Sequence, residues 1–207
     1  MQFQPNIVFD VGKVLFDYNP AVIIRNLVPD SPFQKEYQQH LFESSIWEDL
    51  DQGLLSPSEA KDALVKTYSF MKPNEVANLI ENFWKYLTLI PQSKALFEEL
   101  HQLGYPLYIL SNFQEDAFQK LLFENPFMNL ANGMVVSGRI KLKKPNRDIY
   151  DYLFTTYQLN PADCIFIDDR AENIETSVAL GMQGILFTSF EEVKARLFSL
   201  LSVTTRQ

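Results

Sequence analysis

Three short apolar runs, each followed at once by polar residues, constrain the fold of this chain most strongly. The runs are Ile7–Phe9, Leu107–Leu110 and Ile165–Ile167, and they are followed by Asp10, by Ser111–Asn112 and by Asp168–Asp169. Runs of this length are typical of buried strands. Helical patterns lie between them, and the one over residues 93–104 closes on a glycine. Strands that alternate with helices predict an α/β fold with a mostly parallel sheet and helices on both faces.

The stretch from residue 17 to residue 89 has a different pattern. It contains several helical segments, broken at prolines and at Gly53, and no convincing strand. Ser56–Glu59 reads "SPSE", a capping box with proline at the first helical position. Trp47, Leu50 and Leu54 give these helices apolar faces. We therefore predict an all-helical insertion over residues 17–89, carried by an α/β core of residues 1–16 and 90–207.

Composition limits the classes of partner. The chain of 207 residues is 46% hydrophobic, as in ordinary globular proteins, and its formal net charge is −8. Nucleic acid and anionic membrane surfaces would repel that charge, so neither is expected as a partner. The single cysteine, Cys164, excludes an internal disulfide and a multi-cysteine metal site. Without a signal-peptide pattern or a long apolar run, we expect a cytoplasmic protein; the sequence leaves its oligomeric state open.

The polar residues after the three runs predict a site. If the strands are parallel neighbours, Asp10, Ser111–Asn112 and Asp168–Asp169 emerge at one edge of the sheet, where open α/β sheets bind ligands. Three carboxylates at one place repel one another, so they need a cation or altered protonation. Oxygen ligands of this kind favour Mg²⁺, with a phosphate completing its shell. Zinc is disfavoured because the two histidines, His40 and His101, lie in helical segments.

A basic segment precedes the third run. Five of the ten residues from Gly138 to Arg147 are basic and none is acidic. Lys144 stands out among them, because Pro145 restricts the backbone after it and a helical pattern follows. A lysine held there is placed to neutralise a phosphate and an adjacent aspartate together.

These motifs together resemble the haloacid dehalogenase-like (HAD) hydrolase superfamily. "FDVGKVLFD", "ILSNF", "KKPNRDIY" and "FIDDRAENIETSVALGM" follow the order and spacing of that family over nearly the whole chain. The helical insertion stands where the family carries its small cap domain, beside a Rossmann-like core. The branch of bacterial α-D-glucose-1-phosphate phosphatases and the phosphatase domain of soluble epoxide hydrolases is the most similar. The resemblance implies Mg²⁺-dependent hydrolysis of a small phosphomonoester, such as a sugar phosphate.

The resemblance also assigns roles to individual residues. Asp10 would be the nucleophile and would form an aspartyl-phosphate. Ser111 and the backbone of Asn112 would bind phosphate oxygens, and Lys144 would clamp them.

The same resemblance implies a set of metal ligands. Asp10, the backbone carbonyl of Gly12 and Asp169 would hold Mg²⁺. Asp168 and Asn173 would orient these ligands from behind, as neighbours of metal ligands usually do.

Gly12 departs from the common pattern of the family, which is Asp-x-Asp with the second aspartate as general acid and base. The backbone carbonyl at this position is still present, but the side chain that transfers a proton is not. General acid–base catalysis contributes about 10²–10⁴-fold to the rate. Asp17 could replace the missing acid or cap the entry to the insertion. Tyr18, Asn19 and the segment Trp47–Gly53 are candidates to face the leaving group.

Two other functions remain open at this point. A metal-independent 2-haloacid dehalogenase would also use an aspartate nucleophile without the second acid. A catalytically weak protein that binds a phosphorylated ligand would keep the fold and lose the chemistry. Dependence on Mg²⁺ separates the phosphatase from the dehalogenase.

Overall fold

The protein contains a five-stranded, fully parallel sheet. The computed structural model describes residues 4–204, and the order of the strands in its main sheet is β5-β4-β1-β6-β7. The strands are β1 (Asn6–Phe9), β4 (Leu107–Ser111), β5 (Gly133–Val136), β6 (Cys164–Asp168) and β7 (Gln183–Leu186). The three strands expected from the sequence are its three central strands. The two edge strands, "GMVV" and "QGIL", were not predicted, because each run is short and interrupted by glycine or flanked by polar residues.

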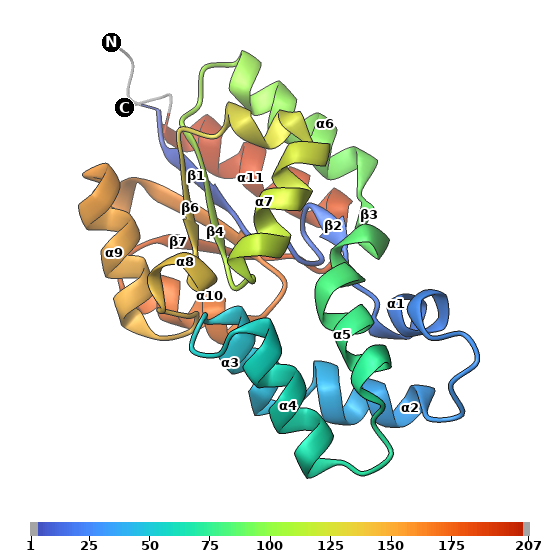
Figure 1. Cartoon of the computed structure of the whole chain (residues 1–207). Helices are drawn as coiled ribbons and strands as arrows, with labels where there is room; N and C mark the ends of the chain where they lie inside the picture. Colours follow the sequence, from blue (N-terminus) through green and yellow to red (C-terminus); the bar gives the residue numbers. More distant parts are fainter. Residues whose placement is uncertain (1–3, 205–207) are drawn as a thin grey trace.

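Helices cover both faces of this sheet, as predicted (Figure 1). They are α6 (Pro91–Gln102), α7 (Glu115–Glu124), α8 (Ser137–Ile140), α9 (Arg147–Tyr157), α10 (Ala171–Ala179) and α11 (Phe190–Thr204), with short 3₁₀ turns at Pro126–Leu130 and Pro161–Asp163. Alternate residues of β1 pack on opposite faces of the sheet. Ile7 and Phe9 pack with α6, α7 and α11, whereas Val8 packs with α9. All three are fully buried, as a central parallel strand requires.

The segment between β1 and α6 is almost entirely helical and lies beyond the carboxyl ends of the strands (Figure 1). Its helices are α1 (Pro20–Leu27), α2 (Gln34–Tyr37), a π-helical turn (Gln38–Phe42), α3 (Ser45–Asp51), α4 (Pro57–Thr67), α5 (Pro73–Asn82) and a 3₁₀ turn (Phe83–Tyr86). The capping box that starts α4 is present, with both the Ser56 and the Glu59 side chain engaged. Trp47 and Leu50 are buried in the shared apolar core, but Leu54 is exposed, because it follows the end of α3. The helical cap is thus confirmed, while the bounds 17–89 remain a prediction.

One expectation for this segment was wrong. A two-stranded antiparallel ribbon joins its ends, with β2 (Phe16–Asp17) paired to β3 (Thr88–Leu89). Strands of two residues are too short for a hydrophobic period to show in the sequence. Asp17 therefore belongs to the ribbon and does not cap the first helix of the insertion. That cap is Asn19, whose side chain accepts from the backbone N–H of Val22.

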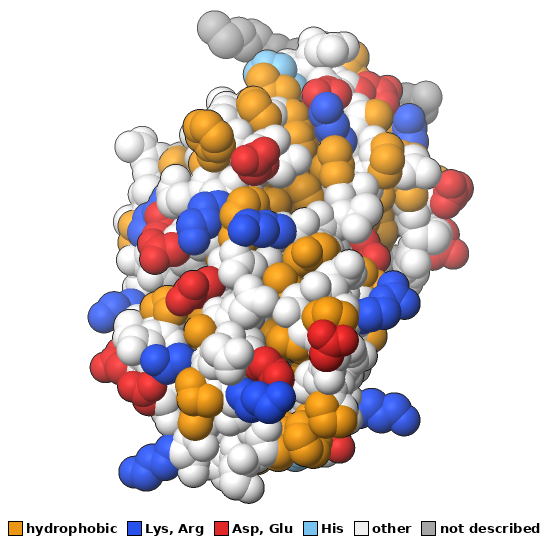
Figure 2. Space-filling model, turned by 45° about the vertical axis from the view of Figure 1, so that its right-hand side comes forward, with side chains coloured by type: hydrophobic (Ala, Val, Ile, Leu, Met, Phe, Trp, Pro, Cys, Tyr) orange, Lys and Arg blue, Asp and Glu red, His pale blue; other side chains and the backbone are white. Residues whose placement is uncertain are grey.

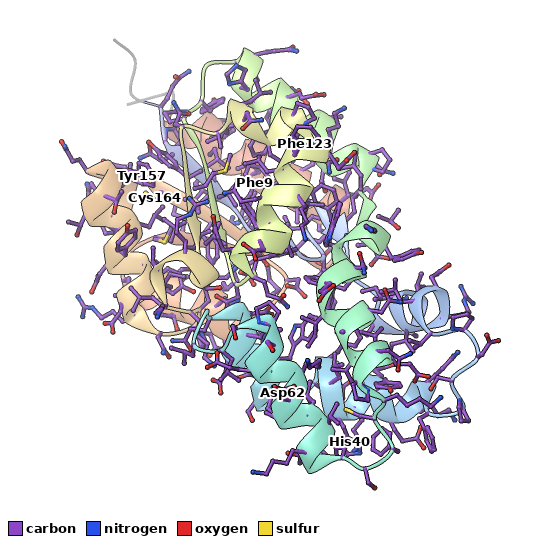
Figure 3. The ribbon with its side chains drawn as sticks, viewed as in Figure 1. Phe9, His40, Asp62, Phe123, Tyr157 and Cys164 are labelled. Atoms are coloured by element: carbon purple, nitrogen blue, oxygen red, sulfur yellow. The ribbon has the colours of Figure 1, made fainter. Side chains whose placement is uncertain are left out.

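The outer surface mixes charges of both signs. On the face shown in Figure 2, basic and acidic side chains are interspersed and neither gathers into a continuous patch. Figure 3 shows Phe123 on the outer side of α7 and His40 at the far end of the helical segment, stacked on Tyr68. Within residues 4–204, no helix combines the length and the apolarity that crossing a bilayer requires.

Candidate active site

The carboxyl ends of the three central strands meet as the sequence predicts. The register of β1 with β4 and β6 places Asp10 level with Asp168 on one side and with Leu110, the residue before Ser111, on the other. One carboxylate oxygen from each of Asp10, Asp168 and Asp169 lies within 4.8 Å of the others. Asp10 and Asp168 are buried and Asp169 is partly exposed. The fold therefore concentrates negative charge at one point of the sheet edge.

The Lys144 ammonium lies between two of these carboxylates. Its Nζ is 2.8 Å from Asp10 Oδ1, 2.7 Å from Asp168 Oδ2 and 2.8 Å from the Leu110 carbonyl oxygen. The three donors of the ammonium thus meet three acceptors, although only 3% of the residue is exposed. Burial alone would lower the pKa of Lys144, but the two carboxylates outweigh it and raise that pKa. The lysine stays charged and orients one oxygen of Asp10.

The Asn112 side chain fixes the backbone of this lysine. Its Nδ2 donates to the Lys144 carbonyl oxygen (2.9 Å), and its Oδ1 accepts from the Lys144 backbone N–H (2.8 Å). The sequence suggested a role only for the backbone of Asn112. The structure adds a side-chain role, because this amide joins the end of β4 to the loop before α9.

A second group of hydrogen bonds fixes Asp168. Its carboxylate accepts from Asn173 Nδ2 at 2.9 and 3.0 Å and from the Arg170 backbone N–H at 2.8 Å. The hydroxyl of Tyr150 in turn donates to the Asn173 carbonyl oxygen (3.0 Å). Asp168 is fully buried and well supplied with donors, so its part in the site is to hold Lys144.

Negative charge at the site exceeds the positive charge that faces it. Burial raises the pKa of Asp10 to about 6, the Lys144 ammonium opposes this shift, and the charge of Asp168 adds to it. Burial and Asp168 likewise raise the pKa of Asp169, whose nearest cation is Lys13, with Nζ 3.6 Å from Oδ2. An oxygen-only set of ligands with uncompensated charge fits a hard divalent cation.

Gly12 is not required by the backbone. It does not lie in the left-handed region, and a Cβ built at this position would meet no atom within 4 Å. The missing carboxylate is therefore a chemical difference and not a steric necessity. The space beside Asp10 is open.

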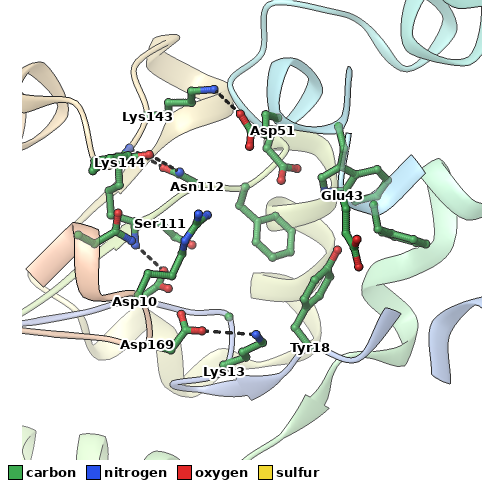
Figure 4. A pocket seen from close by; sticks show the side chains of 18 of the residues that line it. Asp10, Lys13, Tyr18, Glu43, Asp51, Ser111, Asn112, Lys143, Lys144 and Asp169 are labelled. Atoms are coloured by element: carbon green, nitrogen blue, oxygen red, sulfur yellow. Dashed lines mark hydrogen bonds and ion pairs between the residues drawn. The ribbon is translucent and has the colours of Figure 1, made fainter. Parts of the chain in front are cut away.

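That space belongs to a cavity of about 510 Å³ between the sheet edge and the helical segment (Figure 4). It is lined on the sheet side by Asp10, Gly12, Lys13, Ser111, Asn112, Phe113, Lys143, Lys144, Pro145, Asp169, Arg170 and Asn173, and on the helical side by Tyr18, Phe42, Glu43, Trp47, Glu48, Asp51 and Phe83. The residues expected to bind phosphate or metal thus all line one cavity, except the fully buried Asp168.

The helical wall of the cavity was only partly foreseen. Tyr18 and Trp47 line it as suggested, whereas Asn19 is absent because it caps a helix. Phe83 and Glu43 had no signal in the sequence, since apolar and acidic residues are common on helices. Asp51 fell inside a segment named as a candidate but was not singled out.

Comparisons with known proteins agree with this geometry. The family model described as haloacid dehalogenase-like hydrolase matches residues 7–187. A sesquiterpene phosphatase of Aspergillus oryzae is 25% identical over 181 residues, which cover 87% of this chain and 88% of that protein. A drimenol cyclase of Aspergillus calidoustus is 26% identical over 194 residues, 92% of this chain, but the match spans only 35% of the cyclase.

Solved structures show the same fold. A HAD family enzyme of Bacteroides thetaiotaomicron, in complex with magnesium and inorganic phosphate, superposes with a TM-score of 0.71 at 21% identity. The alignment covers 88% of this chain and 93% of that one.

Proposed function

The chain belongs to the haloacid dehalogenase-like hydrolase family, and from this membership and its site we propose that it is a Mg²⁺-dependent phosphomonoesterase. One observation carries the proposal: a single buried ammonium, that of Lys144, bonds two of three clustered carboxylates at the floor of an open cavity. A divalent cation would offset the excess negative charge of such a site, and the cation together with Lys144 would then attract an anion. A phosphomonoester with Mg²⁺ would fit this description.

Asp10, Asp169 and the backbone carbonyl of Gly12 would hold the ion, because they supply hard oxygen ligands on the cavity side. The bound ion would supply positive charge that offsets the charge of the phosphate and of the attacking carboxylate. Lys13, beside Asp169, would adjust the net charge at that ligand.

Asp10 would act as the nucleophile. Lys144 binds its Oδ1, which leaves the other oxygen to attack phosphorus and form an aspartyl-phosphate. Ser111 and the backbone N–H of Asn112 would bind the phosphate oxygens, and Lys144 would neutralise charge on them as it develops. Asp168 and Asn173 act through Lys144 by fixing its position.

The cavity suggests a small metabolite as the substrate. Its volume lies in the range of small-molecule sites. Its helical wall combines aromatic faces, such as Phe42 and Trp47, with the carboxyls of Glu43 and Asp51. Hydroxyl groups of a sugar phosphate would find acceptors there, and its apolar faces would pack on the rings. The relative named as a sesquiterpene phosphatase makes a terpenyl phosphate the second substrate class to test.

Release of inorganic phosphate tests the proposal. The wild type and Asp10→Asn are assayed with p-nitrophenyl phosphate, sugar phosphates and a terpenyl monophosphate, with Mg²⁺ and with EDTA. We expect release that requires Mg²⁺ and is lost in the variant. Halide release from 2-haloacids that persists in EDTA would instead identify a dehalogenase. Binding of phosphorylated ligands without any turnover would favour the ligand-binding alternative.

A further inference from the structure

The reaction proposed above needs a proton donor that the sheet edge does not provide. Gly12 has no side chain, and Lys144 is committed to three acceptors. The other two lysines of the sheet side, Lys13 and Lys143, are each paired with a carboxylate. An alkoxide leaves phosphorus poorly unless an acid protonates it. The donor must therefore lie on another wall of the cavity that contains Asp10.

Two glutamates of the helical wall, Glu43 and Glu48, are exposed, and Glu48 is paired with Lys143. Two aspartates remain as candidates. Asp17 is exposed in the ribbon, paired with Thr88, and it does not line the cavity. Asp51 is the last residue of α3 and does line it. Figure 4 shows the Asp51 carboxyl across the cavity from Asp10, on the side away from Asp169.

The backbone of Asp51 is anchored to the sheet edge. Ser137 Oγ, at the start of α8, donates to the Asp51 carbonyl oxygen at 2.5 Å. The same hydroxyl accepts from the backbone N–H of Phe113 at 2.8 Å. Phe113 directly follows Ser111 and Asn112, the residues proposed to bind phosphate. One hydroxyl thus links the end of α3 to the phosphate-binding loop.

Neighbouring contacts strengthen this anchor. Gln52 Nε2 donates to the Lys141 carbonyl oxygen at 2.9 Å. Gly53, with a left-handed φ of 74°, lies so close to the backbone of Gly138 that a Cβ would come within 2.5 Å of its carbonyl oxygen. Lys143 Nζ binds Glu48 Oε2 at 2.9 Å. The position of Asp51 relative to Asp10 is therefore fixed by the fold.

The surroundings of Asp51 favour its protonated form. Burial raises the pKa of Asp51 to about 8, against the effects of Gln114, Trp47 and the Lys143 charge and with the support of Glu48. The Gln114 side chain faces this carboxyl and is itself buried, yet its Nε2 makes no hydrogen bond of ordinary geometry among the described residues. Desolvation of the carboxyl is therefore the main reason why Asp51 keeps its proton to a higher pH than a free aspartate.

We infer that Asp51 is the general acid and base of this phosphatase, in place of the side chain absent at Gly12. When Asp10 attacks phosphorus, the bond from phosphorus to the leaving oxygen breaks and the Asp51 proton passes to that oxygen. The Asp51 carboxylate then takes a proton from a water molecule, which attacks phosphorus and breaks the bond to Asp10. Phosphate leaves, and both carboxyls return to their first state. The inference rests on the proposed phosphatase function.

The test is the dependence of kcat/KM on the leaving group, because kcat/KM covers the steps up to the aspartyl-phosphate. Asp51→Asn is compared with wild type on p-nitrophenyl phosphate, whose leaving group needs no proton, and on the best alkyl or sugar phosphate of the panel. We expect a loss of about 10²-fold or more on the alkyl ester and less than about threefold on the aryl ester. Asp17→Asn is the matched control and should lose neither.

The pH profile gives a second measurement on the wild type itself. The titratable groups around the Asp51 carboxyl are those of Glu48, Lys143, Glu43 and Tyr18. Since the acid must be protonated, kcat/KM for the alkyl ester should fall as the pH rises through about 8, and the aryl ester should show no such limb.

Several results would overturn the inference. Equal losses on both esters in Asp51→Asn would show a structural role, and a selective loss in Asp17→Asn would move the acid to that residue. If the wild type hydrolysed only aryl esters, no substrate would have a leaving group that needs protonation by Asp51. Absence of any phosphate release by the wild type would instead refute the phosphatase itself.

Discussion

Replacement of Lys144 by methionine tests whether one buried ammonium holds the site together. Methionine keeps the apolar stem of the lysine at similar volume but supplies no donor. Asp10 Oδ1, Asp168 Oδ2 and the Leu110 carbonyl oxygen would each lose a partner now at 2.7–2.8 Å. Buried acceptors that lose a partner cost more than the pair contributed, because water cannot replace it.

The expected loss of stability depends on the hydrogen bonds that Asp10 and Asp168 keep without the lysine. Breaking a buried ion pair by removing one partner costs about 3–5 kcal/mol. Asp168 keeps its donors from Asn173 and the Arg170 backbone, so we expect the lower end, about 3 kcal/mol. For a chain of this length, about 3 kcal/mol corresponds to a fall in Tm of roughly 6–12 °C.

The assay is urea unfolding at pH 7 in EDTA, so that no metal ion enters the comparison. Lys143→Met is a matched control one residue away. Its ammonium pairs with Glu48 at the surface, with side chains 25% and 59% exposed, so its loss should cost about 1 kcal/mol or less. Equal midpoints and equal slopes for the two variants would refute the view that Lys144 carries the charge balance of the site.

Two further variants test other parts of the structure by the same urea unfolding. Gly12→Ala should leave the free energy of unfolding within about 1 kcal/mol of the wild type, because the added Cβ meets no atom within 4 Å; a larger loss would show that glycine is needed there. Burial opposes the ionisation of Glu75, but donors from Lys72 and Tyr37 outweigh it and lower its pKa. Glu75→Gln should therefore destabilise the protein at pH 7 and progressively less as the pH falls below about 4; a loss that is constant with pH would contradict this.

The sequence is informative about the centre of the molecule because the signals there are local. A short apolar run that ends in a carboxylate specifies a buried strand and the residue at its carboxyl end together. Parallel pairing then brings Asp10, Ser111 and Asp168 to one edge without further information. Lys144 could be singled out because a proline and a helical pattern follow it, although the Asn112 side chain, 32 positions away, fixes its backbone. Fold class and the sheet side of the cavity could therefore be predicted.

The helical wall could not be predicted, because tertiary contacts alone give its residues their place. Glu43 and Asp51 are two of many acids on amphipathic helices, and a helical period does not distinguish an acid facing a cavity from one facing water. Asp51 faces the cavity because Ser137, 86 positions further along the chain, binds its carbonyl oxygen. A contact over that distance leaves no pattern in one sequence.

The two walls also differ in what a substitution can do to the reaction. In the proposed reaction, the sheet side would hold the nucleophile, the phosphate and the ion through residues that depend on one another, as Asn173 holds Asp168 and Asp168 holds Lys144. A change there should affect every substrate. The helical side would face the leaving group, so a change there at residues other than Asp51 should alter the ranking of substrates. If the proposed mechanism holds, substitutions in the helical wall would change the substrate or the proton donor without altering the residues proposed to attack phosphorus.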